Sequence, residues 1–252
     1  MKLTLLEHPT TSTSKVFQAR LEEELGKLKG ELDAGISLYI PQRNGWTQVG
    51  ITGEDGEIVA ELIANKFALA HLYLGDIDVQ GNYQAEIMGA SERGLNFDMG
   101  IERGHVECVV PTSNLNAQLT DGKKLPLPHV MECYCLYPGM KIAVRVTRKT
   151  DHEIEGWLAD SFIDRLDDWI KTGLDRIMAF ECFRKEAESS VLKAHLTRDV
   201  ITVDSLGLTV QSFVCKLGTD AVGLIPKLGH ILRNQPLKPF QPKKITSRCR
   251  PW

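Results

Sequence analysis

Hydrophobic residues alternate with polar ones in several short segments of this chain. In the longer segments between them, hydrophobic residues recur every three to five positions. Alternation predicts strands with one buried face, and the longer period predicts amphipathic helices. Leu3 and Leu5 indicate a short first strand, and a helix follows from Lys15. Residues 36–40 and 46–51 alternate again, which predicts two further strands.

Turn and cap signals separate these N-terminal elements. The polar run Thr10 to Ser14 supplies N-cap candidates for the first helix, and Asn44-Gly45 is a hairpin signal between the two later strands. Gly53-Glu54-Asp55-Gly56 opens a second helix that carries Ile58 and Phe67. The acidic residues at its start favour the helix dipole and are not expected to act in catalysis. The predicted order is β-α-β-β-α, a small sheet with helices on one side.

The segment from Gly75 to Arg148 predicts a single five-stranded barrel. Alternation returns at 81–87 and 95–100 and again at 105–110, with short turns between these strands. A longer excursion follows Pro111, and Tyr137-Pro138-Gly139-Met140 then leads into a last strand over 141–148. In that strand, alternate apolar residues face inward.

Within this segment, the runs GLNFDMGI, VVPTSNL and PGMKIAVRV resemble those of the S1 RNA-binding domain, an OB-type barrel. The resemblance implies RNA binding on one open face, through a basic groove and aromatic stacking. Two positions depart from the pattern. Asn96 stands where such domains often have an aromatic residue, and Pro111 stands where they often have a histidine.

Basic residues at outward strand positions and in loops of the barrel are candidates for contacting RNA phosphates. They are Arg93, Arg103, His105, Lys123, Lys124, Lys141, Arg145 and Arg148. The alternative is ordinary solvent-exposed charge.

Beyond the barrel, Asp151 to Glu155 is predicted to be a charged link into an amphipathic helix. Leucine, isoleucine and phenylalanine recur every four residues from Leu158 to Leu174, and Ile177 and Met178 widen the stripe. This stripe indicates a core-facing helix, with partner binding as the alternative. Alternation then predicts strands over 191–196, 200–203 and 208–217.

The run VCKLGTDAVGLIPKLG, over 214–229, predicts a strand that ends at Gly218 and a following helix that Thr219 or Asp220 can cap. Exposed N–H groups at such a helix start can bind phosphate. Gly223 and Gly229, on either side of Lys227, weakly resemble the glycine loop of KH domains. The order Asp-x-x-Gly-Leu-Ile weakly resembles that of small-ligand regulatory α/β domains. A plain strand-to-helix junction is the third interpretation. No P-loop motif occurs.

The last residues form a basic, proline-rich segment that we expect to be extended. No acidic residue follows Asp220, whereas the stretch from Asp151 to Glu188 is rich in acid. Its prolines disfavour a helix, and such tails often bind nucleic acid or are disordered. The basic candidates here are Lys227, Lys243, Lys244, Arg248 and Arg250.

A metal site is not expected. Cys108, Cys133, Cys135, His105 and His129 fall near the barrel, but their spacing does not supply two paired ligand motifs. On a strand, Cys133 and Cys135 would share a face. Buried, reduced thiols are the simpler interpretation.

Composition limits the possible functions. With 252 residues and a net charge of −3, the chain can hold two or three small domains but does not coat nucleic acid with its whole surface. There is no apolar run of membrane-spanning length and no signal peptide, which predicts a cytoplasmic protein without membrane partners. No catalytic triad, paired catalytic carboxylates or nucleotide loop is found, so no cofactor or enzyme activity is expected.

The order of the parts resembles an archaeal family called domain of unknown function 2110. The likeness rests on WTQVGITGEDGE, GLNFDMG, LTDGKKLPLP and VCKLGTDAVGLIPKLG. We therefore expect an α+β protein in four parts: an N-terminal α/β domain over 1–72, the S1-like barrel over 73–150, a helix with an α/β domain over 151–234, and the basic tail over 235–252.

The leading functional hypothesis is an RNA-binding protein of the ribosome or other RNA-processing machinery, with possible protein partners in the same assembly. The alternative is a protein scaffold whose barrel no longer binds RNA.

Overall fold

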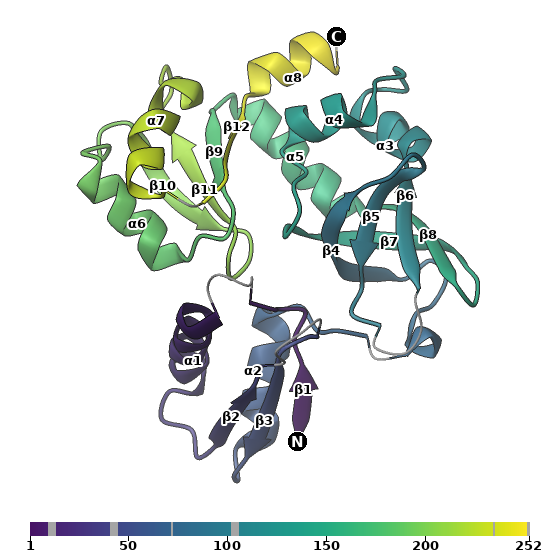
Figure 1. Ribbon diagram of the computed structural model, residues 1–252, viewed down its shortest axis with the longest axis vertical. Helices are drawn as coiled ribbons and strands as arrows, with labels where there is room; N and C mark the ends of the chain where they lie inside the picture. Colours follow the sequence, from purple (N-terminus) through teal and green to yellow (C-terminus); the bar gives the residue numbers. More distant parts are fainter. Residues whose placement is uncertain (10–13, 41–44, 72, 102–105, 234, 251–252) are drawn as a thin grey trace. The chain divides into compact units, whose positions relative to one another are not determined.

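The computed structural model describes residues 1–9, 14–40, 45–71, 73–101, 106–233 and 235–250 (Figure 1). The chain divides into two units: residues 1–77 with 99–105, and residues 78–98 with 106–252. The predicted α+β class with a central barrel is confirmed. In the part of the chain that is described, no helix combines the length and the apolar character needed to cross a membrane.

The first unit has the predicted β-α-β-β-α order. Its elements are β1 (Lys2–Thr4), α1 (Ser14–Lys29), β2 (Gly35–Tyr39), β3 (Gln48–Thr52) and α2 (Gly56–Lys66), with a short 3-10 turn, η1, at Leu74–Asp76. The antiparallel sheet has the order β1-β3-β2. Both helices pack against each other and against the sheet, burying Phe17, Leu21, Val49, Ile51 and Ile63. The N-cap run at 10–13 and Asn44 lie outside the described residues.

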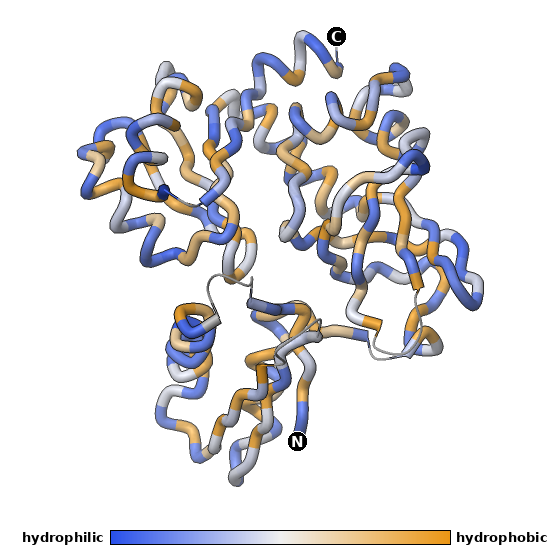
Figure 2. The backbone as a smooth tube through the Cα atoms, viewed as in Figure 1, coloured by the Kyte–Doolittle hydropathy of each residue, from blue (hydrophilic) through white to orange (hydrophobic). Residues whose placement is uncertain are grey.

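The second unit begins with the barrel. Its strands are β4 (Asn82–Ala90), β5 (Gly94–Asp98), β6 (Glu107–Pro111), β7 (Lys141–Lys149) and β8 (Glu153–Leu158), in the closed order β4-β5-β6-β8-β7. Every pairing is antiparallel except that of β6 with β8. Hydrophobic and hydrophilic residues alternate along these strands (Figure 2), which is the pattern that the sequence shows. The result is an OB-like barrel.

Strand β8 corrects the prediction of a charged link at Asp151 to Glu155. Ile154 and Leu158 are buried in the barrel, whereas the carboxylates of Glu153 and Glu155 form ion pairs outside it. The acidic residues thus occupy the outward positions of a period-two pattern. Because three of the first five residues after Thr150 are acidic, their charge obscured that alternation in the sequence.

Two helices, α3 (Thr112–Leu119) and α4 (Leu127–Tyr134), form the excursion between β6 and β7, and α5 (Asp160–Thr172) follows the barrel. The predicted helix therefore starts two residues later than Leu158 and ends before Leu174. Ile177 and Met178, which were assigned to its apolar stripe, lie in a strand instead. Gly173, at φ +66°, ends α5 in the left-handed conformation.

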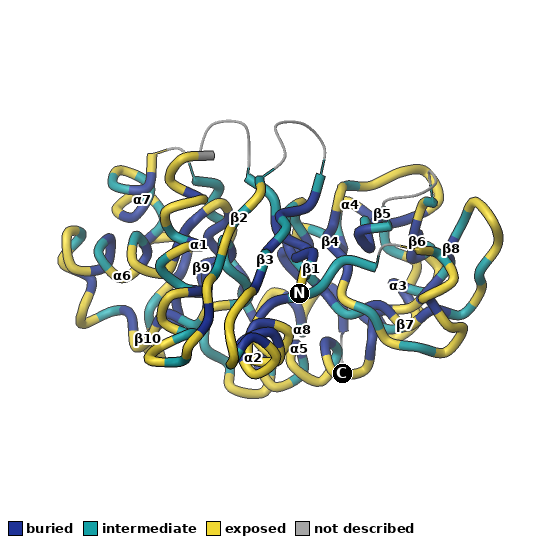
Figure 3. Tube along the Cα trace, turned by 90° about the horizontal axis from the view of Figure 1, so that it is seen from below, coloured by how far each residue is buried: buried dark blue, intermediate teal, exposed yellow. Residues whose placement is uncertain are grey.

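The rest of the second unit is a four-stranded antiparallel sheet with two covering helices. Its elements are β9 (Arg176–Ala179), α6 (Arg184–Lys193), β10 (Val200–Ser205), β11 (Gln211–Cys215), α7 (Ala221–Ile231) and β12 (Leu237–Phe240). The strand order is β10-β11-β9-β12, and the βαββαβ connection is that of ferredoxin-like domains. Exposed and buried positions alternate along α6 and α7 (Figure 3), whose buried sides pack on the sheet.

The strand predicted over 191–196 is wrong. Val191 belongs to α6, where Ala187, Ser190 and Val191 share the buried side at helical spacing. Glu186 accepts a hydrogen bond from the backbone N–H of Phe183 at 3.3 Å, which stabilises the start of this helix. The apparent alternation comes from the end of α6 and the turn that follows.

The prediction of an extended tail over 235–252 is also wrong. Residues 237–240 form β12 at the edge of the sheet, and α8 (Pro242–Arg248) follows it. Pro239 is tolerated because an edge strand needs no N–H on its free side. Pro242 lies in the first turn of α8, where a proline removes no helical hydrogen bond. The prolines therefore mark boundaries and do not prevent regular structure.

Candidate nucleic-acid interface

Strands β7 and β8 place a cation and an aromatic ring side by side on the outside of the barrel. Arg145 of β7 is directly opposite Trp157 of β8 and is also opposite Asn82 of β4. The three side chains therefore form one row across the outer surface. Trp157 remains 37% exposed, although burying an indole is strongly favourable.

A hollow of about 430 Å³ lies at this row. Its lining comes from α3, β7, β8 and α5: Gln118, Arg145, Thr147, Trp157, Leu158, Asp160 and Ile163. The Gln118 amide donates to the carbonyl of Leu158 at 2.7 Å and accepts from its N–H at 3.0 Å. This pair of bonds joins α3 to the end of β8 and fixes one wall of the hollow.

Among the described groups around the hollow, the Arg145 guanidinium has one hydrogen-bond partner and one long, exposed ion pair. Its Nε donates to Gln80 Oε1 at 3.1 Å, and its Nη1 lies 3.9 Å from the carboxylate of Asp160. The side chains of Arg145 and Asp160 are 45% and 83% exposed, so solvent screens this pair. The Nη side of Arg145 is therefore exposed and can meet an anion while Nε keeps its bond to Gln80.

The outer surface of β5 and β6, by contrast, is poorly equipped to bind bases. All of its outward positions are described, and none is aromatic: they include Asn96, Asp98, Glu107 and Pro111. The Asn96 side chain accepts a hydrogen bond from Ser91 Oγ at 3.0 Å. Since stacking needs a ring and phosphates need cations, this face offers neither.

Several of the predicted basic residues are engaged with carboxylates. Arg93 pairs with Glu153, and Arg148 pairs with Glu155 at 2.8 Å. Lys141 lies 3.6 Å from Glu86 with both side chains at most 10% exposed, so it is not a free outward charge. Arg103 and His105 lie outside the described residues.

A second group of cations forms where α8 meets the loop between α3 and α4. Lys123 Nζ donates to the carbonyl of Arg248 at 3.1 Å, which brings this loop to the end of α8. We call Lys123, Lys124, Lys243, Lys244 and Arg248 the α8 basic patch; all five residues are exposed. Lys227 is exposed on α7.

Arg250 has a structural position and is withdrawn from the RNA-binding set. It is 6% exposed. Its guanidinium donates to the carbonyls of Leu119 and Gln118, at 3.1 and 2.8 Å, and to the carboxylate of Asp167. These carbonyls end α3, where a cation also suits the helix dipole. The pair of Arg250 with Asp167 thus neutralises part of the charge difference between the acidic stretch 151–188 and the basic C-terminal segment.

The start of α7 does not offer a free phosphate site at Gly218, Thr219 and Asp220. The Asp220 carboxylate accepts from the N–H groups of Val222 and Gly223, at 3.3 and 3.1 Å, as the predicted N-cap. Asp175 accepts from the N–H of Ala221 at 3.2 Å. Two carboxylates therefore occupy the donors that a phosphate would need and would repel its charge. Gly223 and Gly229 lie within α7 and not in a KH-type loop.

The sheet of the second unit is also closed to bases. Related βαββαβ domains bind RNA through aromatic residues on the free sheet face. Here the Arg176 guanidinium lies 4.5 Å from the ring centroid of Trp169, and Trp169 meets Phe240 edge-on at 5.3 Å. Because α5 supplies Trp169, this face packs against a helix of the same unit.

The cysteines are mostly unreactive by environment. Burial raises the pKa of Cys108, Cys135, Cys182 and Cys215 to about 12, so these thiols stay protonated near neutrality. Cys133 lies on helix α4 and Cys135 is its C-cap, so the expected shared strand face is wrong. Instead, His129 and Cys133 of α4 lie beside Cys249 at the end of α8.

Trp157 is the principal residue that sequence reasoning missed. The predicted charged link ends at Glu155 and the predicted helix begins at Leu158, so Trp157 between them was given no element and no role. The signal that could have found it is the alternation of Ile154, Gly156 and Leu158 around it.

Comparison with known families gives one match and one negative result. Residues 174–238 match the family model of the DUF2110 C-terminal domain. The matched range begins before β9 and ends in β12, so it corresponds to the βαββαβ sheet. No curated protein matches the chain.

Proposed function

The chain carries the DUF2110 C-terminal domain, and from the surface of the barrel beside it we propose that the protein binds single-stranded RNA through β7 and β8. Trp157 would stack on a base, Arg145 would bind the neighbouring phosphate, and the α8 basic patch would extend the contact. We place this activity in the cytoplasm of archaeal cells, with the ribosome or other RNA-processing machinery.

The exposed Trp157 opposite Arg145 is the observation that carries this proposal. Base stacking on an aromatic side chain contributes about 1–3 kcal/mol per base and tolerates any base. A hollow of about 430 Å³ falls within the range of about 300–1,000 Å³ typical of small-molecule sites, so it has room for one nucleobase. The Thr147 hydroxyl donates to the carbonyl of Glu155 at 3.1 Å and can still accept a hydrogen bond at the edge of the hollow.

The β7–β8 location differs from the surface on which OB-type barrels commonly bind oligonucleotides, which centres on their second and third strands. In this chain those strands are β5 and β6, whose outward side chains include Asp98 and Glu107. Two acidic residues there disfavour a phosphate backbone. Strand β8 also has outward acidic residues, Glu153 and Glu155, but Arg93 and Arg148 pair with them. The aromatic and cationic groups instead lie on the fourth and fifth strands, and this displacement supports the proposed location.

The association is tested by sedimenting native cell extract through a density gradient, with and without nuclease. The proposal predicts that the protein migrates with ribosomal particles or a defined RNA, and that nuclease releases it to the top of the gradient. Migration that nuclease leaves unchanged contradicts the proposal.

A protein scaffold is the second candidate, because the ion pairs of Arg93, Lys141 and Arg148 reduce the free positive charge of the barrel. This candidate predicts a stable protein partner that is retained after nuclease treatment. Recovery of RNA without a protein partner would count against it.

A further inference from the structure

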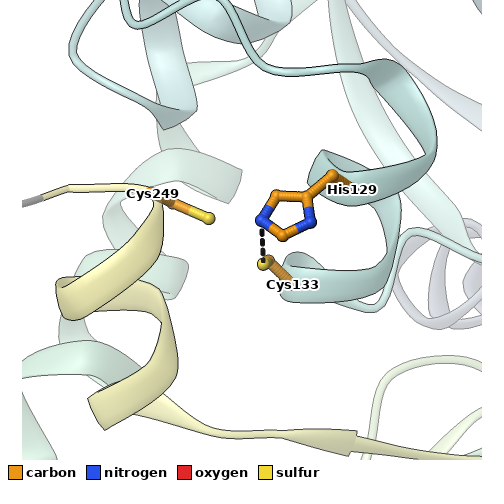
Figure 4. A group of neighbouring side chains, drawn as sticks. All are labelled: His129, Cys133 and Cys249. Atoms are coloured by element: carbon orange, nitrogen blue, oxygen red, sulfur yellow. Dashed lines mark hydrogen bonds between the residues drawn. The ribbon is translucent and has the colours of Figure 1, made fainter.

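Three potential metal ligands from two distant parts of the sequence converge at the junction of α4 and α8. His129 and Cys133 come from α4, and Cys249 comes from the end of α8, with their side chains pointing toward one another (Figure 4). One ligand atom of each residue lies within 4.8 Å of the others. Neither the proposed RNA contact nor the barrel needs this arrangement.

The local structure holds each ligand in place. His129 and Cys133 are four residues apart on α4, so they share one face of the helix. The N–H of Cys249 donates to the carbonyl of Ile245 at 2.8 Å, which continues α8 up to the thiol. Directly after it, Arg250 binds the end of α3 and Asp167. The position of Cys249 is therefore fixed from both sides.

The distances agree with a tetrahedral ion. Zinc lies about 2.3 Å from a thiolate and about 2.0–2.1 Å from an imidazole nitrogen, so two such ligands are about 3.6 Å apart across a tetrahedral edge. Cys133 Sγ and His129 Nε2 are 3.7 Å apart. Two thiolates on the same ion would be about 3.8 Å apart, a spacing that the 4.8 Å limit allows.

The charge of the ligand set suits a divalent cation, although the cations Lys123 and Arg248 also lie near Cys249. Cys249 is buried, and His129 and Cys133 are half-buried. A bound ion of charge +2 deprotonates its thiols. Two thiolates and one neutral imidazole then leave the site without net charge, which makes partial burial inexpensive.

We propose that His129, Cys133 and Cys249 form a Cys2His site for Zn²⁺ or a similar soft divalent ion. Three protein ligands leave a fourth coordination position for water or another donor. The ion would fasten α8 to α4 and hold the α8 basic patch against the loop that carries Lys123. Sequence spacing alone does not reveal the site, because Cys249 is more than a hundred residues from the α4 pair.

A disulfide between Cys133 and Cys249 is the competing use of the same sulfurs. Both cysteines are free in the structure. A disulfide would use only the two sulfurs and would give no role to His129, the third side chain that points into the cluster. A metal uses all three groups at once.

The site is tested on the full-length reduced protein, stripped with chelator and titrated with Co²⁺ as a spectroscopic substitute for Zn²⁺. We expect one Co²⁺ per chain, with thiolate-to-cobalt charge-transfer absorption and the ligand-field bands of a tetrahedral ion. Zn²⁺ should displace the Co²⁺ and raise the Tm of the protein.

His129 and Cys133 are half-buried, so they are the ligands chosen for substitution. His129→Ala and Cys133→Ser should weaken Co²⁺ binding by at least roughly 100-fold, beyond the loss typical of an outer-shell change, and should remove the Zn²⁺ effect on Tm. Matched controls are His230→Ala, an exposed histidine, and Cys182→Ala, a buried thiol outside the site; both should bind Co²⁺ as the unchanged protein does. Circular dichroism verifies folding.

Three outcomes would overturn the proposal. One is a folded, reduced protein that shows no charge-transfer absorption with Co²⁺. Another is equal binding by the unchanged protein and the two ligand variants. The third is a Cys133–Cys249 disulfide in protein purified without reductant, with no metal bound after its reduction.

Discussion

Arg145 on β7 and Trp157 on β8 are directly opposite neighbours, and both line the hollow beside α5. The cation and the ring therefore lie at the spacing of two adjacent strands, and these are the groups that we propose contact a phosphate and a base. The register between β7 and β8 fixes this relationship on the outside of the barrel.

Arg145 should contribute one phosphate contact. On single strands, each such contact adds about −0.7 to the slope of log affinity against log salt. Arg145→Ala should therefore flatten that slope by about 0.7. The control is Arg184→Ala on α6, which removes an exposed arginine paired with Glu188 and should leave the slope unchanged. Equal slopes for the two variants would remove Arg145 from the interface.

Substituting Arg250 should affect the stability of the protein, whereas substituting Arg248 should affect RNA binding. Arg250→Ala leaves Asp167 and the Gln118 carbonyl without their Arg250 donor, while the Leu119 carbonyl keeps its bond from the Tyr134 hydroxyl, so we expect the free energy of unfolding to fall by about 1–3 kcal/mol. Arg248→Ala, on the exposed side of α8, should stay within about 0.5 kcal/mol but weaken RNA binding. Urea denaturation and RNA titration of both variants measure the two effects. A stable Arg250→Ala protein would show that its contacts are not needed.

Asp220 should act as a helix cap and not as part of a phosphate site. Asp220→Ala removes the acceptor for Val222 and Gly223 and should cost about 1 kcal/mol of stability. Thr219→Ala and Asp220→Asn should leave RNA affinity unchanged. A tighter complex for Asp220→Asn would instead indicate a phosphate near this helix start, because the substitution removes a repelling charge.

His71 should make stability depend on pH. Burial lowers the pKa of its imidazole, against a smaller opposing effect of Asp76. The unfolded chain therefore binds the proton more readily, so the stabilisation is present above the unfolded pKa of about 6.5 and is lost as the pH falls below it. Urea denaturation at pH 7.5 and 5.5, roughly one unit on either side of that pKa, should show a smaller loss for His71→Gln.

The exposed His230→Gln variant is the control for this measurement, and its pH dependence should match that of the unchanged protein. If His71→Gln loses as much stability on acidification as the unchanged protein, another group is responsible.

Local patterns predicted most elements of this fold but not all of its long-range pairings. The first unit, four barrel strands and the Asp220 cap follow from alternation, helical spacing and turn residues. β8 was missed because charged residues at its outward positions obscure the alternation. β12 and α8 were missed because their prolines, Pro239 and Pro242, indicated irregular structure, although both lie at positions that tolerate proline. Local propensity is a weak guide where tertiary pairing decides.

The candidate sites depended even more on pairing across the chain. Arg250 and Arg248 are indistinguishable in the sequence, yet one is buried against α3 and the other is exposed. Cys249 joins His129 and Cys133 only because α8 packs against α4. Trp157 becomes a candidate stacking residue only once β8 is recognised as a strand opposite Arg145.

The most direct measurement compares the affinity of the full-length protein, Trp157→Phe and Trp157→Ala for labelled single-stranded RNA by fluorescence anisotropy at fixed salt. Tyr39→Ala, which removes an exposed ring from β2, is the control. Loss of one stacked base should weaken binding by Trp157→Ala roughly 5- to 150-fold, with Trp157→Phe and Tyr39→Ala close to the unchanged protein. Equal affinity for all four proteins would contradict RNA binding at the β7–β8 surface.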